Sequence, residues 1–120
     1  MLVLETRMID EKPLRKVERD NHIAVVYSSG YGTGWYSWNR EHPGLMFDPL
    51  IVEWVLAGPA GKSWRNVIED HVANTYPDSH LDCIDRLQVR WLPTGTKFRI
   101  NEDRGHERII RVDEDVWHVA

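Results

Sequence analysis

The sequence predicts an α+β fold, in which strands from the N- and C-terminal parts of the chain form an antiparallel sheet and two central helices follow one another. β-prone segments lie at both ends of the chain, whereas apolar residues recur at helical spacing only in its middle. Strands grouped in this way, and not alternating with helices, argue against a doubly wound parallel sheet. The length suits a single domain over residues 1–120.

The N-terminal part is predicted to form strands. Residues 2–9 are β-prone, and Asp10–Pro13 favours a turn. Leu14–Arg19 alternates loosely and is compatible with a second strand or a single helical turn. After a turn at Asp20–Asn21, His22–Tyr27 is the clearest strand, because it is short, rich in β-branched residues and apolar throughout, as a central strand would be.

Two helices are predicted in the middle of the chain. Asp48 is an N-cap with Pro49 at the first helical position, and Gly58–Gly61 stops this helix. Ser63 is the expected cap of the second helix, which ends at Tyr76 because the residue before a proline disfavours helical geometry. One face of the second helix is expected to carry Trp64, Val67, Ile68, His71 and Val72.

The C-terminal part is predicted to contain strands joined by tight turns. Leu87–Leu92 and Thr96–Ile100 alternate cleanly on either side of a turn at Pro93–Gly95, so they are predicted to pair as a hairpin. After another turn, His106–Val112 is a further strand, and Val116–Val119 can pair as a short terminal strand.

Composition and charge exclude several classes of function. The net charge of −4 argues against long nucleic acids as partners, because their phosphate backbone requires a basic surface. Cys83 is the single cysteine, which favours a reducing compartment. No apolar run approaches the length of a membrane span, and the N-terminus lacks a signal-peptide pattern, so we expect a cytoplasmic protein without a membrane partner. Six tryptophans favour interfaces or ligand pockets.

A glycine-rich, aromatic stretch directly after the central strand is the first candidate for a ligand site. Glycines at alternate positions allow the backbone to come close to a ligand, and the rings offer flat faces and polar edges. The alternative is a loop whose rings fill the protein's own core. The candidate ligand-binding residues here are Tyr31, Gly32, Thr33, Gly34, Trp35, Trp38 and Asn39.

The late predicted hairpin is the second candidate. It combines rings for stacking, threonine hydroxyls and basic groups for phosphate, and side chains able to bind base edges or ribose hydroxyls. This combination suits a nucleotide. The alternative is ordinary strand alternation, with rings inward and charges solvated. The candidate ligand-binding residues here are Trp91, Thr94, Thr96, Phe98, Arg99, Asn101, Asp103 and Arg104.

Motifs for other chemistry are not matched. Gly30–Gly34 departs from the G-x-G-x-x-G spacing of a dinucleotide fold, and Gly61–Ser63 lacks the first glycine of a phosphate loop because Leu56 stands at that position. The histidine spacings fit no tight metal motif, and His71 is expected to be a core histidine. We therefore predict no metal, no cofactor and no catalytic residue.

Taken together, these stretches resemble a family of small phage proteins. Tyr31–Asn39 matches a Gly-x-Gly-Trp-x-x-Trp pattern after a strand, and Phe47–Pro49 matches its helix start. Trp91–Asn101 and Gly105–Ile110 match a late hairpin that reads Pro-x-Gly-Thr-x-Phe-Arg-Ile. From about Ile23 onward the chain is similar to the phage anti-Thoeris proteins of the first described type.

The resemblance implies a non-enzymatic, oligomeric protein that sequesters a cyclic ADP-ribose signal in the host cytoplasm and blunts a bacterial immune response. Some members are understood to bind cyclic oligonucleotides as well. Carried over, Trp91, Asn101 and Asp103 would face adenine and ribose, and Arg99 and Arg104 the pyrophosphate. Glu102–Gly105 departs from the Tyr-Asp-Gly of the family pattern.

Two other classes of function remain open. One is a nucleotide-processing enzyme that uses the loop with His80, Asp82 and Asp85 as acid and base. The other is a protein-binding inhibitor of a host defence factor, with tryptophans as interface anchors.

Overall fold

The computed structural model describes residues 14–58, 63–114 and 119–120, and it confirms the α+β fold. Two antiparallel sheets are present, one with the strand order β1-β2-β3 and one formed by β4 and β5. The strands are β1 Glu18–Arg19, β2 His22–Ser28, β3 Leu87–Pro93, β4 Phe98–Asp103 and β5 His106–Arg111. The α-helices are α2 Pro49–Ala57 and α3 Arg65–Thr75, and the 3-10 helices are η1 Tyr36–Trp38, η2 Pro43–Met46, η4 Ile84–Arg86 and η5 Val112–Glu114.

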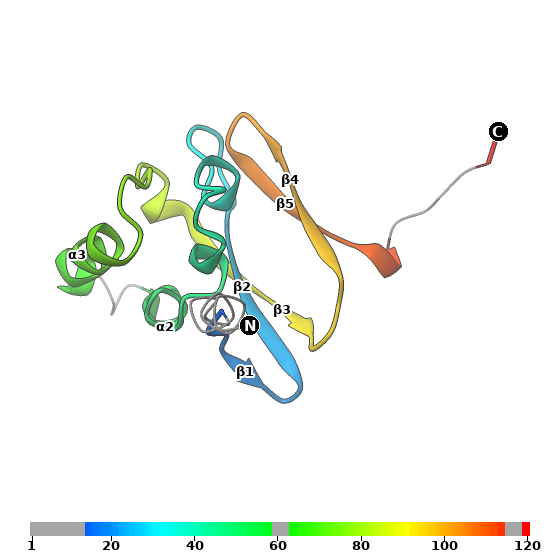
Figure 1. Ribbon diagram of the computed structural model, residues 1–120, viewed down its shortest axis with the longest axis horizontal. Coiled ribbons are helices and arrows are strands. Elements are labelled where there is room, and N and C mark those ends of the chain that lie inside the picture. The colour runs from blue at the N-terminus through cyan, green and yellow to red at the C-terminus, as the bar shows by residue number, and fades with distance from the viewer. Residues whose placement is uncertain (1–13, 59–62, 115–118) are drawn as a thin grey trace, which may run out of the picture.

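The three-stranded sheet lies between the two other parts of the fold. Figure 1 shows α2 and α3 on one side of it and the β4–β5 hairpin on the other. In the part of the chain that the structure describes, no helix is long and apolar enough to span a bilayer.

β2 is the central strand of its sheet, as the sequence predicts. Ala24 and Val26 belong to the hydrophobic cluster that contains the helices, whereas Val25 belongs to a second cluster with Phe47 and Ile109. All three β2 side chains are fully buried, because side chains alternate between the faces of a strand and both faces are covered here. This explains the uninterrupted apolar run of the sequence.

The predicted boundaries of α2 are confirmed. The Asp48 carboxylate accepts hydrogen bonds from the backbone N–H groups of Leu50 at 2.9 Å and Ile51 at 3.1 Å. Pro49 occupies the first turn, where it removes no helical hydrogen bond. Gly58 ends the helix with a φ of 59°, in the left-handed region that favours glycine.

The end of α3 at Thr75 is confirmed, but its start and its inner face are corrected. Trp64 is the N-terminal boundary residue and no side chain caps this end, so the predicted Ser63 cap is wrong. Ile68 and Val72 are buried, whereas Trp64 and Val67 are 47% and 58% exposed. A helix at the edge of a small fold buries only a narrow stripe, here the residues four apart.

The predicted pairing of the late hairpin is wrong. β3 pairs along its whole length with β2, from Ser28 opposite Leu87 to His22 opposite Pro93, and β4 pairs with β5. The turn at Pro93–Gly95 exists, but it leads the chain from one sheet to the other. The hairpin turn is Arg104–Gly105, where both residues have positive φ, at 52° and 85°, as two-residue hairpin turns require.

The N-terminal predictions are met in part. Asp20–Asn21 is the turn between β1 and β2, with φ of 51° and 60°. Only Glu18–Arg19 of the expected second strand is a strand. The expectations for residues 2–13 lie outside the described residues, and most of the expected terminal strand at 116–119 does too.

Candidate functional site

The two candidate stretches meet at one place, where the loop after β2 lies against the tip of the β4–β5 hairpin. The backbone N–H of Gly32 donates to the carbonyl of Arg104 at 2.6 Å, and Nδ1 of His106 donates to the carbonyl of Ser29 at 2.6 Å. A Cβ on Gly105 would lie 1.9 Å from the carbonyl oxygen of Gly32, so only glycine permits this approach.

A buried carboxylate holds the loop on the hairpin. Glu107 of β5 is 1% exposed, and its two oxygens accept from the backbone N–H groups of Ser28 at 2.8 Å and Ser37 at 2.7 Å. Both ends of the loop are thereby fixed to one side chain. A sequence signal existed, since Glu107 lies two residues from the buried Ile109 and thus on the inward face of its strand.

A hollow of about 510 Å³ opens at this junction. Tyr31 is 64% exposed and stacks on His106, with ring centroids 5.2 Å apart. The residues that line the hollow are Tyr31, Asn101, Glu102, Asp103, His106 and Arg108. An aromatic face therefore lies beside an amide, two carboxylates and a guanidinium, groups that can bind a base, hydroxyls and a phosphate.

Two further candidate residues lie beside the hollow, and a third lies on the strand that lines it. Trp38 donates from Nε1 to the Glu102 carboxylate at 3.3 Å. Arg104 is close to Asp103, at 3.7 Å, with its side chain 85% exposed. Arg99 is exposed and lies two residues before Asn101 on β4, so it projects from the same face of that strand.

Other residues of the glycine-rich stretch shape the loop from within. Trp35 is fully buried and donates from Nε1 to the carbonyl of Leu45 at 2.9 Å. Asn39 donates to the carbonyls of Trp35 at 2.8 Å and His80 at 3.2 Å. Thr33 and Gly34 are buried, and a Cβ at Gly34 would lie 2.1 Å from Ser37 Oγ. Thr33, Gly34, Trp35 and Asn39 therefore fit the alternative in which this stretch packs into the protein's own core.

The start of the late stretch is not brought to the hollow, because it belongs to another strand pair. Trp91 lies on β3, in the cluster with the helices, and the Arg19 guanidinium lies 5.5 Å from its ring centroid. The Phe98 ring meets Phe47 edge-on. Thr94 and Thr96 bond within the turn region: the Thr94 N–H donates to Asn21, and the Thr96 hydroxyl donates to Pro93.

The side chains of the acid-rich loop, His80, Asp82 and Asp85, contact different partners. Asp85 forms an ion pair with Arg65 at 2.5 Å. Asp82 accepts from the Thr33 hydroxyl at 3.4 Å, and the His80 ring meets Trp38 edge-on. Burial raises the pKa of the nearby Cys83 thiol to about 11, so this cysteine is protonated at neutral pH.

A larger cavity, of about 930 Å³, lies between α3 and the segment that leads into α2. Within it the second oxygen of the Asp48 carboxylate accepts from His71 Nε2 at 2.8 Å and from the Tyr76 hydroxyl at 2.7 Å. Burial and this hydrogen bond raise the pKa of Tyr76 well above its usual value. His71 was expected in the core, yet its side chain is 27% exposed. Sequence reasoning missed this cluster, since its residues come from separate helices.

Neither the comparison with known proteins nor the arrangement of possible metal ligands distinguishes between the classes of function. Comparison with protein-family models, curated proteins and solved structures finds no match. In the described ranges, no group of three or more His, Cys, Asp or Glu side chains is arranged to hold a metal ion.

Proposed function

We propose that this protein binds a cyclic ADP-ribose isomer, or a similar cyclic nucleotide signal, and sequesters it without turnover. The observation that carries the proposal is the hollow at the hairpin tip, where the exposed Tyr31–His106 stack lies beside polar and charged side chains. Its volume of about 510 Å³ falls in the range of small-molecule sites, roughly 300–1,000 Å³. The resemblance to the anti-Thoeris proteins favours the same class of ligand.

The aromatic pair supplies the binding surface for the base. Tyr31 is exposed over most of its surface, so an adenine ring can stack on its free face. Nδ1 of His106 is committed to the Ser29 carbonyl, which fixes the imidazole in one orientation. Its Nε2 is then the acceptor in the neutral ring, and the exocyclic amine of adenine is a suitable donor.

The strand end supplies partners for the sugar and phosphate parts of the ligand. The carboxylates of Glu102 and Asp103 and the amide of Asn101 can accept hydrogen bonds from ribose hydroxyls. Arg108 lines the hollow, and Arg104 lies beside it with its guanidinium exposed. Arginine binds phosphate oxygens through two parallel hydrogen bonds, which suits a pyrophosphate.

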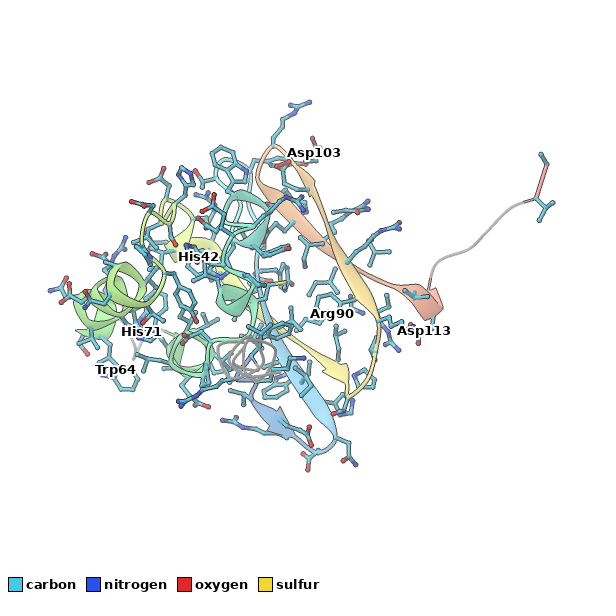
Figure 2. The ribbon with its side chains drawn as sticks, in the orientation of Figure 1. His42, Trp64, His71, Arg90, Asp103 and Asp113 are labelled. Atoms are coloured by element: carbon cyan, nitrogen blue, oxygen red, sulfur yellow. The ribbon has the colours of Figure 1, made fainter. Side chains whose placement is uncertain are left out.

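Sequestration consumes one site per ligand, so a homo-oligomer with several sites in the host cytoplasm fits this function. Exposed apolar side chains on the helical side support self-association. Trp64 and Val67 are three residues apart and thus neighbours on the α3 surface, and both are about half exposed. Trp64 lies far from Asp103 at the hairpin tip, so a contact through this surface leaves the tip accessible (Figure 2).

Titration calorimetry with cyclic ADP-ribose isomers tests the site. Tyr31→Ala should weaken binding by about 10-fold or more, because one base–aromatic stack contributes about 1–3 kcal/mol. Trp91→Phe should bind as wild type, because Trp91 packs against the helices. If Trp91→Phe weakens binding and Tyr31→Ala does not, the base stacks on Trp91 and the hollow is not the binding site.

Denaturing the loaded protein distinguishes the classes of function. Intact ligand released from the protein supports sequestration, whereas a degraded product would favour the nucleotide-processing enzyme. If no cyclic nucleotide raises the melting temperature and a host protein is retained in a pulldown, the protein-binding inhibitor replaces this proposal.

A further inference from the structure

The cavity beside α3 is lined by polar side chains that nucleotide sequestration at the hairpin tip does not use. Figure 2 shows His71 at α3 and Asp103 at the hairpin tip, so the two places lie in different parts of the molecule. The cavity is also the more spacious of the two, at about 930 Å³. Its function can therefore be considered separately.

The Asp48 carboxylate is held in place as a hydrogen-bond acceptor. Its side chain is 6% exposed, and one oxygen accepts from the first backbone N–H groups of α2. The positive end of a helix stabilises a carboxylate in this position. The other oxygen accepts from His71 and Tyr76, so four donors hold the carboxylate in one orientation.

This arrangement selects the tautomer of His71. Because Nε2 donates to Asp48 at 2.8 Å, the neutral imidazole carries its lone pair on Nδ1. The nearest partner of Nδ1 is the Thr75 hydroxyl, at a long 3.4 Å. A carboxylate that orients an imidazole, whose other nitrogen meets a hydroxyl, is the arrangement of a general base.

The cavity walls favour a small, partly apolar substrate. Leu14, Pro43 and Leu50 line it together with the Tyr76 ring, and Arg15, Glu41 and His42 add charged and polar groups. Gly44 runs against that ring, where a Cβ would come within 3.1 Å of it, so the glycine keeps the wall close to Tyr76. Apolar walls with a few polar groups are typical of small-molecule sites.

We propose that Asp48 and His71 form a general-base pair that hydrolyses a small carboxylic ester in this cavity. His71 Nδ1 takes a proton from a water molecule as the water oxygen forms a bond to the ester carbonyl carbon and the π electron pair of the C=O bond moves onto the carbonyl oxygen. That pair then re-forms the C=O bond as the carbon–oxygen bond to the alcohol breaks, and the proton passes from Nδ1 to the departing oxygen. Asp48 keeps the ring oriented and stabilises its protonated form, and Thr75 holds Nδ1 in the free protein.

Hydrolysis of p-nitrophenyl acetate by the full chain tests this proposal. His71→Gln should lower the rate by about 100-fold or more, the usual contribution of a general base. Asp48→Asn should also lower it, while asparagine remains a good helix N-cap and preserves α2. His22→Gln is the matched control and should hydrolyse as wild type, because His22 lies at the β1–β2 turn. Equal rates for wild type and His71→Gln would overturn the proposal.

Two further measurements test the nucleophile and the tautomer of His71. Mass spectrometry of the wild-type protein during p-nitrophenyl acetate hydrolysis should show Thr75 unmodified, and an acetyl adduct on Thr75 would overturn water as the nucleophile. Nitrogen NMR of the histidine rings of the wild-type protein should show His71 protonated at Nε2, whereas protonation at Nδ1 would contradict the pair. Neither result depends on cyclic nucleotide binding at the hairpin tip.

Discussion

Glu107 places a charged group where the fold has almost no contact with solvent. Its carboxylate is 1% exposed and accepts from two backbone N–H groups nine residues apart, at Ser28 and Ser37. Buried charges are tolerated when hydrogen bonds replace those of water. This residue therefore joins β5 to both ends of the glycine-rich loop.

Glu107→Ala should lower the free energy of unfolding by about 2–5 kcal/mol, because one buried and one partly buried backbone donor then lose their acceptor. Urea denaturation measures the change. Glu53→Ala is the matched control, since Glu53 is half exposed in its ion pair with Arg19 and such pairs contribute at most about 1 kcal/mol. Equal losses would show that the buried carboxylate has no special role.

Cys83 makes the stability of the protein depend on pH in the alkaline range. Burial raises the pKa of this thiol to about 11, from 9.0 when unperturbed, so the unfolded chain loses the proton first. A raised pKa stabilises the fold below pH 9, and this contribution is lost as pH rises towards 11. Urea midpoints should therefore fall between pH 9 and 11, and Cys83→Ala should flatten this decline. An unchanged decline would assign it to other groups, such as Tyr76.

At the scale of elements, boundaries that depend on local chemistry were predictable and pairings were not. Asp48, Pro49 and Gly58 mark the ends of α2 by effects within one turn, and the sequence locates them correctly. The alternating strands around Pro93–Gly95 satisfy every local rule for a hairpin. They separate because β3 pairs with the more distant β2, and β4 finds its partner beyond Arg104–Gly105.

Gly105 and Gly95 form a matched pair for testing how the hairpin tip docks. Both have similar positive φ, 85° and 88°, but a Cβ at Gly95 would meet open space whereas one at Gly105 would collide with Gly32. Gly95→Ala should cost about 1–2 kcal/mol of stability from backbone strain alone. Gly105→Ala should cost more and also weaken nucleotide binding, as thermal unfolding and calorimetry would show. Similar effects of both variants would argue against close docking.

At the scale of the whole molecule, the sequence predicts part of the hollow at the hairpin tip but not the Asp48–His71 pair. Tyr31, Asn101 and Asp103 were predicted and line the hollow, because their segments carry the relevant chemistry locally. His106 was missed, since its role arises only when the hairpin tip meets the loop after β2. The Asp48–His71 pair was missed for the same reason, as its two residues are joined only by the packing of α3 against the start of α2.

The exposed apolar surface of α3 can be tested as a contact between copies of the protein. If Trp64 and Val67 form a contact between copies, Trp64→Glu should shift the molar mass from light scattering towards that of the 14.1 kDa chain. Val112→Glu is the control, because Val112 is equally exposed but follows β5. A wild-type protein that is already monomeric would exclude this contact.

The two-sided burial of β2 has a consequence for how its pairing is specified. A strand with one apolar face resists slipping by one residue, since every side chain would change sides. β2 carries apolar residues on both faces, so hydrophobic pattern alone distinguishes poorly between neighbouring alignments. The correct alignment must then be set at its ends, by the left-handed pair Asp20–Asn21 and by Glu107 at Ser28. A strand that is hydrophobic throughout is thus placed by polar anchors.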